Sequence, residues 1–101
     1  MKPLDHLVVV GVGLIGGSFA LALREAGAVR RITGVGRRRE TLEEARRLGL
    51  IDDFADVYAC VREADLVMLA MPVGQTSAVL EAMAPHLGER TIVTEIGRAH
   101  V

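Results

Sequence analysis

The sequence predicts an α/β fold in which a parallel sheet of about five strands is covered by helices on both faces. Short runs of Val, Ile and Leu alternate with segments of helical composition along the whole chain. These runs lack the alternation of apolar and polar residues that a half-exposed strand shows, which is typical of strands buried on both faces. Four glycines between positions 11 and 17 separate the first apolar run from the first helical segment.

The first half of the chain predicts two strands and two helices. A β-branched run predicts a strand over 6–10, and helix formers follow over 14–26, with Gly27 at the helix C-terminus. A second strand is expected over 32–35. Thr41 and Glu44 have the spacing of a capping box, so we expect a helix from Thr41 to about Leu48, closed by Gly49.

The second half predicts two more strands and a third full helix. Residues 50–65 are ambiguous and are expected to form a turn or very short strand, then a short helix over 57–63. The run LVMLAM at 66–71 is the clearest buried strand. A helix is expected to start near Thr76 and to be kinked or ended by Pro85, before a last strand over 91–94.

Composition excludes several classes of protein. The 101 residues include 12 basic and 13 acidic side chains, so no global positive charge attracts nucleic acid. The uncharged run 7–23 is shorter than the ~20 apolar residues of a membrane span, and its glycines weaken a continuous helix. The single cysteine, Cys60, fits a reducing compartment, and we expect a cytoplasmic protein without membrane partners.

The remaining polar candidates give no metal or acid–base site. His6, His86, His100 and Cys60 lack the spacing of metal ligands, so no metal is expected. Asp52 and Asp53 are adjacent, so in a strand they would point to opposite faces. In a turn we expect them to cap residues 55–57 rather than to act as an acid–base pair.

The glycine cluster has the pattern of a dinucleotide-binding loop. Gly11-Val12-Gly13-Leu14-Ile15-Gly16 matches G-x-G-x-x-G, and it follows a predicted strand and opens a predicted helix, which is the context that the motif requires. Gly11 permits a tight turn, Gly13 lets a pyrophosphate approach the backbone, and Gly16 lets helix and strand pack closely. The free N–H groups of the helix N-terminus then face the phosphates. The sequence therefore predicts a Rossmann-type fold that binds a dinucleotide.

The end of the second predicted strand indicates which dinucleotide is preferred. Where an NAD-binding protein of this fold carries an acid for the ribose 2′-hydroxyl, this chain has Gly36, followed by Arg37 and Arg38. An acid there would oppose a 2′-phosphate by about 4 kcal/mol at ~4 Å and an effective dielectric of ~20. Glycine leaves room, and arginine offers a forked donor that suits phosphate. We therefore expect NADP to be the cofactor, with NAD also open because arginine can stack on adenine.

The alternative for these arginines is a set of solvated charges that pair with Glu40, Glu43 or Glu44. For Arg39 this alternative is the expectation.

Four stretches resemble one enzyme family. GVGLIGGSFALALREAG at 11–27, RRLGLIDDFAD at 46–56, ADLVMLAMPVGQT at 64–76 and TIVTE at 91–95 are similar to the prephenate/arogenate dehydrogenase family of tyrosine biosynthesis. The resemblance covers residues 7 to about 95. It implies an NAD(P)-dependent oxidoreductase that oxidatively decarboxylates prephenate or arogenate to 4-hydroxyphenylpyruvate or tyrosine. It also implies a Rossmann domain followed by a helical dimerisation domain, so a homodimer is expected only with that second domain.

The resemblance implies cofactor-binding roles by position. The pyrophosphate would be lined by Gly11, Gly13, Leu14, Ile15 and Gly16. Arg37 and Arg38 would flank the adenosine ribose. The wall beside the cofactor would be formed by Met71, Pro72 and Val73.

The catalytic residues of the family have no counterpart in this sequence. The family's T-D-x-G-S motif corresponds to residues 94–98, where Arg98 stands in place of the serine, and His100 is not at the position of the family histidine. We therefore expect residues 1–95 to be the N-terminal portion of the nucleotide-binding domain. The helical domain lies outside the sequence, and the chain alone is expected to be inactive.

The last six residues, 96–101, are expected to be a non-native tail. Their sequence, IGRAHV, is the translation of ATC GGA AGA GCA CAC GTC, which reads like the start of a short-read sequencing adapter.

Two other functions stay open at this point. One is a stand-alone module that senses a dinucleotide and regulates a partner. The other is a different Rossmann dehydrogenase, such as an imine reductase, which shares the loop but explains the LGLID stretch less well.

Overall fold

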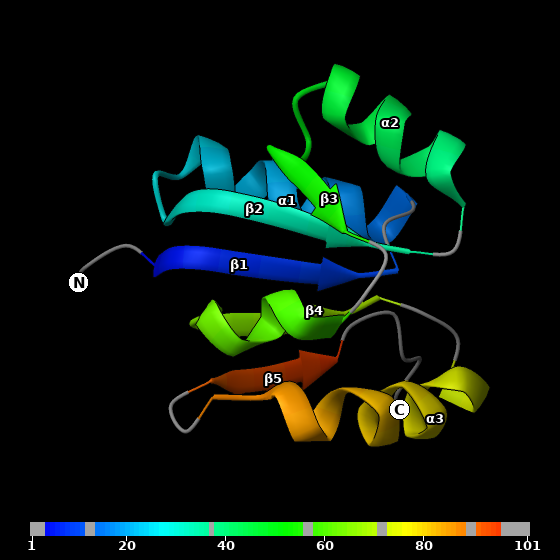
Figure 1. Cartoon of the computed structure of the whole chain (residues 1–101). Coiled ribbons are helices and arrows are strands. Elements are labelled where there is room, and N and C mark those ends of the chain that lie inside the picture. The colour runs from blue at the N-terminus through cyan, green and yellow to red at the C-terminus, as the bar shows by residue number, and fades with distance from the viewer. Residues whose placement is uncertain are drawn as a thin grey trace.

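The computed structural model contains one parallel sheet of five strands. It describes residues 4–11, 14–36, 38–55, 58–70, 73–88 and 91–95. The strands lie in the order β3-β2-β1-β4-β5, and every neighbouring pair is parallel (Figure 1). Their bounds are β1 Leu4–Val10, β2 Val29–Val35, β3 Asp53–Ala55, β4 Leu66–Leu69 and β5 Ile92–Glu95. The predicted fold class is confirmed.

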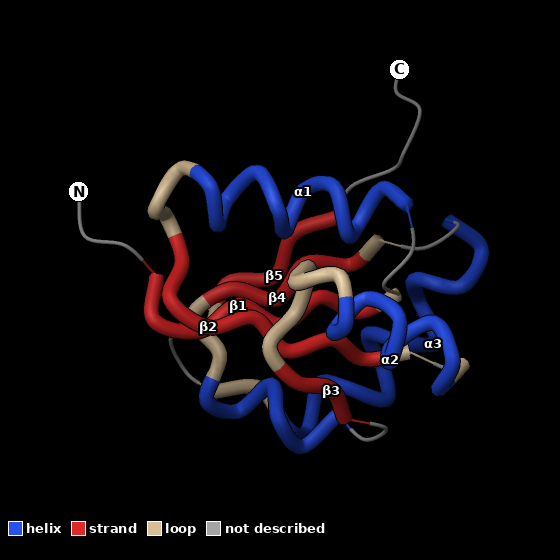
Figure 2. Tube along the Cα trace, turned by 90° about the horizontal axis from the view of Figure 1, so that it is seen from above, coloured by secondary structure: helices blue, strands red, loops and turns tan. Residues whose placement is uncertain are grey.

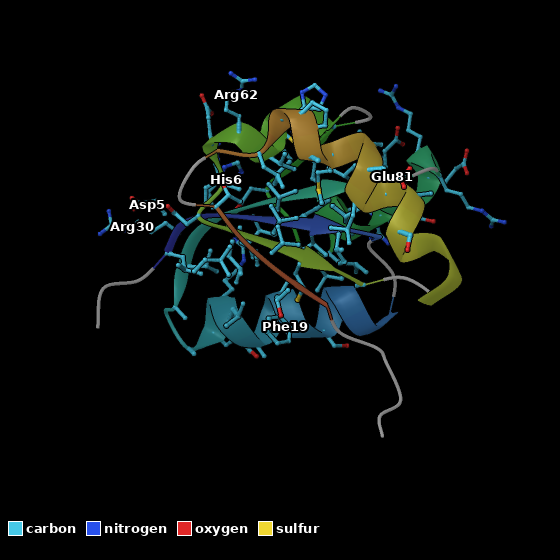
Figure 3. The ribbon with its side chains drawn as sticks, turned by 90° about the horizontal axis from the view of Figure 1, so that it is seen from below. Asp5, His6, Phe19, Arg30, Arg62 and Glu81 are labelled. Atoms are coloured by element: carbon cyan, nitrogen blue, oxygen red, sulfur yellow. The ribbon has the colours of Figure 1, made fainter. Side chains whose placement is uncertain are left out.

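Helices cover both faces of this sheet. The α-helices are α1 Leu14–Glu25, α2 Arg39–Arg47 and α3 Val73–Met83, and the 3₁₀ helices are η1 Tyr58–Glu63 and η2 Ala84–His86. Figure 2 shows α1 running along one side of the strands, and Figure 3 shows α1 and α3 on opposite sides of the sheet. The crossover from β3 to β4 through η1 moves the chain from one half of the sheet to the other.

Two apolar clusters hold the three layers together. On the α1 side, Leu7 and Val9 of β1 pack with buried residues of α1 and α2, namely Ala20, Leu42 and Ala45. On the α3 side, Val8 and Val10 pack with Val61 of η1 and Met83 of α3. Successive residues of β1 thus enter opposite clusters, which explains why its sequence is apolar without interruption.

The start of α2 differs from the prediction. The helix begins at Arg39 rather than Thr41, and its N-cap is Arg38, which makes no side-chain cap hydrogen bond. The first turn is closed by the Leu42 N–H, which donates to the Arg38 carbonyl at 3.2 Å. The capping-box prediction was wrong because Thr41 lies inside the first turn of α2 and not at its N-cap.

Other boundaries moved by a few residues. β1 and β2 begin at Leu4 and Val29, which pair with each other ahead of the predicted starts. The first part of β2 was not predicted because residues 30 and 31 are charged and interrupt the apolar run. β4 ends at Leu69, and α3 begins at Val73 rather than near Thr76.

Between α2 and β4 the chain forms a short strand and then a short 3₁₀ helix. Of the turn and the very short strand that were expected before this helix, the structure has the strand.

Within the described ranges no helix is both long and apolar enough to cross a membrane. The expected non-native tail at 96–101 lies outside the described residues.

Candidate functional site

The candidate site lies at the edge of the sheet where β1, β2 and β4 end together. Val10, Val35 and Leu69 are at the same level in the strand register. β1 continues through α1 to β2 on one side, whereas β4 on its other side is reached from β3. Between β1 and β4 the strand order therefore reverses, and ligands of open parallel sheets bind beyond the carboxyl ends of the strands at such a point.

Gly11 makes the turn that leaves β1. Its φ of 85° lies in the left-handed region that favours glycine. Its N–H donates to the Val35 carbonyl at 2.7 Å, and on the other side of β1 the Ala70 N–H donates to the Val10 carbonyl at 2.9 Å. The end of β1 is thus tied to both neighbouring strands, and the predicted tight turn at Gly11 is present.

Gly16 permits the close approach of α1 to the sheet. A Cβ atom there would lie 3.0 Å from the Cβ of Ala70 and 3.2 Å from both the Gly11 carbonyl oxygen and Cγ1 of Val9. No side chain fits without a shift, so the close packing predicted for Gly16 is present. The first turn of α1 consequently lies close to the ends of β1 and β4. The N–H groups of the first turn of a helix have no helical acceptors, which makes a helix N-terminus suited to bind an anion.

Several predicted site residues are only partly described. Gly13, Arg37, Met71 and Pro72 lie outside the described residues. The backbones of Leu14, Ile15 and Val73 belong to helices, Leu14 and Val73 being the first residues of α1 and α3. The cofactor-binding roles of all these residues stay predictions.

The residues that follow β2 combine a glycine with space for a side chain, Gly36, and an exposed cationic side chain, Arg38. Gly36 follows Val35, and among the described residues a Cβ placed on it would touch only Leu42, whose Cδ2 and Cγ lie at 3.5 and 3.8 Å. Arg38 is extended, with φ −99° and ψ 111°, and its side chain is exposed. In the part of the chain that the structure describes, the Arg38 side chain has no hydrogen bond or ion pair.

Arg39 has a different role from Arg38. Its Nε lies 2.9 Å from Oε1 of Glu43, one turn further along α2. Its guanidinium carbon lies 5.8 Å from the ring centre of Phe54, within the range of a cation–π contact. The expectation that Arg39 is a paired surface charge is confirmed.

Asp52 and Asp53 have partners that the sequence did not indicate. Asp52 accepts two hydrogen bonds from Arg24 and one from the Ile32 N–H, and the Arg24 hydrogen bond is the main reason why its pKa is lowered. Asp53 accepts a hydrogen bond from the Thr33 hydroxyl at 2.7 Å. The carboxylates therefore connect the segment between α2 and β3 to α1 and β2. Of the residues that they were expected to cap, 56 and 57 lie outside the described residues.

Two further titratable groups lie away from the edge that carries the site. His6 is buried near the amino-terminal end of β1, on the side of Asp5 and Arg30 in Figure 3, and hydrogen-bonds to Thr33. Cys60 of η1 is half-buried, and burial raises the pKa of its thiol. Over the described ranges, no group of three or more His, Cys, Asp and Glu side chains could hold a metal ion.

Comparison with known proteins shows which family the chain resembles. Residues 19–101 match the family model described as "Prephenate dehydrogenase, nucleotide-binding domain". Prephenate dehydrogenase of Bacillus subtilis is 41% identical over 96 residues, which are 92% of this chain and 26% of the relative.

Solved structures agree with this match. Arogenate dehydrogenase of Synechocystis superposes with a TM-score of 0.84 at 34% identity, over 91% of this chain and 32% of its own. Prephenate dehydrogenase of Aquifex aeolicus, solved with hydroxyphenyl propionate and NAD⁺, superposes with a TM-score of 0.83 at 34% identity, over 90% and 32% of the two chains. The chain thus spans about a quarter to a third of these relatives.

Proposed function

The chain belongs to the nucleotide-binding domain family of prephenate dehydrogenases, and from this premise we propose that it binds NAD(P) at the edge formed by β1, β2 and β4. The Gly11 turn, the close contact at Gly16 and the N-terminus of α1 support binding of the pyrophosphate there. When bound, the cofactor supplies the hydride acceptor. The residues of this chain orient its adenosine and phosphate groups.

The preferred cofactor in this proposal is NADP. The observation that carries it is the pairing of an open Gly36 with the exposed Arg38 at the N-terminus of α2. Gly36 leaves the space that a 2′-phosphate needs, and Arg38 supplies a cation that is not engaged elsewhere in the described structure. Arg39, which is paired with Glu43, is not part of the proposed site. Arg37 is included on the sequence argument alone.

For the protein from which this chain comes, we propose oxidative decarboxylation of prephenate or arogenate. The support is the similarity to enzymes named for these two substrates, over about a third of their length or less. The partner would be that small-molecule substrate, and dimerisation would need the helical domain. The 101-residue chain is proposed to be inactive alone, because hydride transfer needs substrate held in near-attack geometry and none of its residues has a proposed catalytic role.

Titration of the purified chain with NADPH and NADH tests the cofactor proposal. We expect both to bind, with NADPH at least about tenfold tighter, because each charge-assisted hydrogen bond to the 2′-phosphate contributes roughly 1.5–3 kcal/mol. Equal affinities would refute the NADP preference, and no binding of either would refute the dinucleotide site. A separate assay for NADPH formation from prephenate or arogenate should give no turnover above background, and measurable turnover would refute the inactivity of the chain.

A further inference from the structure

An ion pair joins the end of α1 to the segment that follows α2. Nη1 of Arg24 lies 3.0 Å from Oδ1 of Asp52, and Nη2 lies 3.0 Å from Oδ2, so the guanidinium and the carboxylate meet in a two-bond fork. The side chains are 33% and 37% exposed, which leaves the pair less screened than a fully exposed one.

The same segment is attached to β2 and to α1 by other contacts. Oδ2 of Asp52 accepts the Ile32 N–H at 2.8 Å, and the Asp52 N–H donates to the Ile32 carbonyl at 2.8 Å. Leu50 packs against α1, where a Cβ on Gly17 would lie 3.0 Å from Cδ1 of Leu50. Asp52 is therefore the point at which α1, β2 and the end of α2 are connected.

The Arg24–Asp52 pair lies near the carboxyl-terminal ends of α1 and α2, whereas the amino-terminal ends of these two helices form the proposed cofactor site. Arg24 is in the last turn of α1, and α1 begins after the Gly11 turn. Asp52 follows the end of α2, and α2 begins beside Gly36, with Leu42 packed behind that glycine. Because both helices connect parallel strands, both start at the carboxyl edge of the sheet and lead away from it.

We infer that the Arg24–Asp52 pair is a positioning device that sets the distance between the two phosphate-binding helix N-termini. The inference rests on the proposed function, in which α1 faces the pyrophosphate and α2 with Arg38 faces the 2′-phosphate. A rigid ligand that carries both phosphates gains from both sites only when their spacing matches its own. A ligand with only the 5′-phosphates does not depend on that spacing.

Asp52→Asn is the variant that tests this device most cleanly. Asparagine is nearly the same size and its carbonyl oxygen can still accept the Ile32 N–H, whereas the charge that faces Arg24 is lost. Arg24→Gln removes the other partner and serves as the second variant if the first does not fold. Glu44→Gln is the matched control, because it removes one carboxylate from the exposed Glu44–Arg47 pair on α2 itself.

Calorimetry of the 101-residue chain with NADPH and with NADH supplies the readout, because the two ligands share the pyrophosphate and differ only in the 2′-phosphate. We expect Asp52→Asn and Arg24→Gln to raise the Kd of NADPH about tenfold and that of NADH less than about twofold. The double variant should be no weaker than either single variant, because the two residues act as one pair. Glu44→Gln should change neither Kd.

The outcomes separate this inference from the function on which it rests. An unchanged Kd of NADPH in folded Asp52→Asn and Arg24→Gln would overturn the positioning role. Equal losses for both ligands would also overturn it, because they indicate general damage to the fold. Equal affinities of the unmodified chain for NADPH and NADH would refute the proposed 2′-phosphate site itself.

Discussion

A Cβ atom on Gly36 would lie 3.5 Å from Cδ2 of Leu42, which is an ordinary van der Waals distance. Gly36 is also not among the glycines with positive φ in the described structure. Neither backbone conformation nor packing therefore requires glycine at this position, so a side chain can be introduced there to test the cofactor preference directly.

Gly36→Asp is expected to reverse the preference from NADP to NAD. A carboxylate about 4 Å from the 2′-phosphate opposes it by up to about 4 kcal/mol at an effective dielectric of 20, and solvent reduces this figure. We expect NADPH to bind at least about tenfold more weakly, while the affinity for NADH is kept or improved because the acid can accept the ribose hydroxyl. Gly36→Ala is the control and should keep the NADP preference; parallel losses for both cofactors in Gly36→Asp would contradict the assignment.

Arg38→Ala is expected to weaken NADPH binding much more than NADH binding. The lost charge-assisted hydrogen bonds to the 2′-phosphate contribute roughly 1.5–3 kcal/mol, which corresponds to a Kd about ten- to a hundredfold higher for NADPH. Arg39→Ala is the matched control on the next residue and should leave the cofactor ratio unchanged, because Arg39 is held by Glu43 and lies over Phe54. Fluorescence titration of both variants with NADPH and NADH measures the cofactor ratio. Equal effects of the two substitutions would show that Arg38 does not bind the phosphate. Adding Arg37→Ala to Arg38→Ala should enlarge the difference.

Gly16→Val is expected to reduce both stability and cofactor affinity. Its side chain would meet Ala70 and the Gly11 carbonyl, and such overpacking typically costs about 1–3 kcal/mol and shifts the start of α1. Gly27→Ala is the control, because its φ of +71° makes alanine strained although no described residue lies within 4 Å of the new Cβ. Both variants should melt earlier, but only Gly16→Val should lower the affinity for NADPH. Unaltered binding by folded Gly16→Val would contradict the phosphate-binding role of the Gly11–Gly16 loop.

The sequence predicted those parts of the structure that depend on residues close together in the chain. These are the Gly11 turn, the glycine at the end of α1 and the buried strands, each of which has a recognisable local residue pattern. The start of α2 was misplaced because the Thr41–Glu44 spacing also fits a helix interior, which is where both residues lie. The Arg24–Asp52 pair joins residues 28 positions apart, and no periodicity encodes such a pairing.

The hydrogen bonds of His6 were equally hidden from the sequence, and they bring the side chains of three strands together. Nε2 of His6 lies 2.7 Å from Oγ1 of Thr33, which in turn donates to Oδ1 of Asp53 at 2.7 Å. Since the hydroxyl proton points to Asp53, Nε2 must be the donor to Thr33, and a neutral ring then carries its single proton on Nε2. Nη2 of Arg31 lies 3.2 Å from Nδ1 and 3.4 Å from Nε2, so a cation stands against the same ring.

The last prediction is that this chain loses stability as the pH falls below the ordinary pKa of histidine. Burial, and then the charge of Arg31, lower the pKa of His6 from 6.5, against the opposing effects of the Glu63 backbone and of the Asp53 and Glu63 carboxylates. Between the lowered pKa and 6.5 the unfolded chain binds more protons at this site than the folded chain, so the free energy of unfolding rises with pH across that window and levels off above it. Denaturant titrations between about pH 5 and about pH 8 should show this rise. His6→Gln should flatten it, whereas His86→Gln, on η2 outside the network, should not. A His6 resonance that titrates above 6.5 in the folded chain would contradict the prediction, because the sign of the dependence would then be reversed.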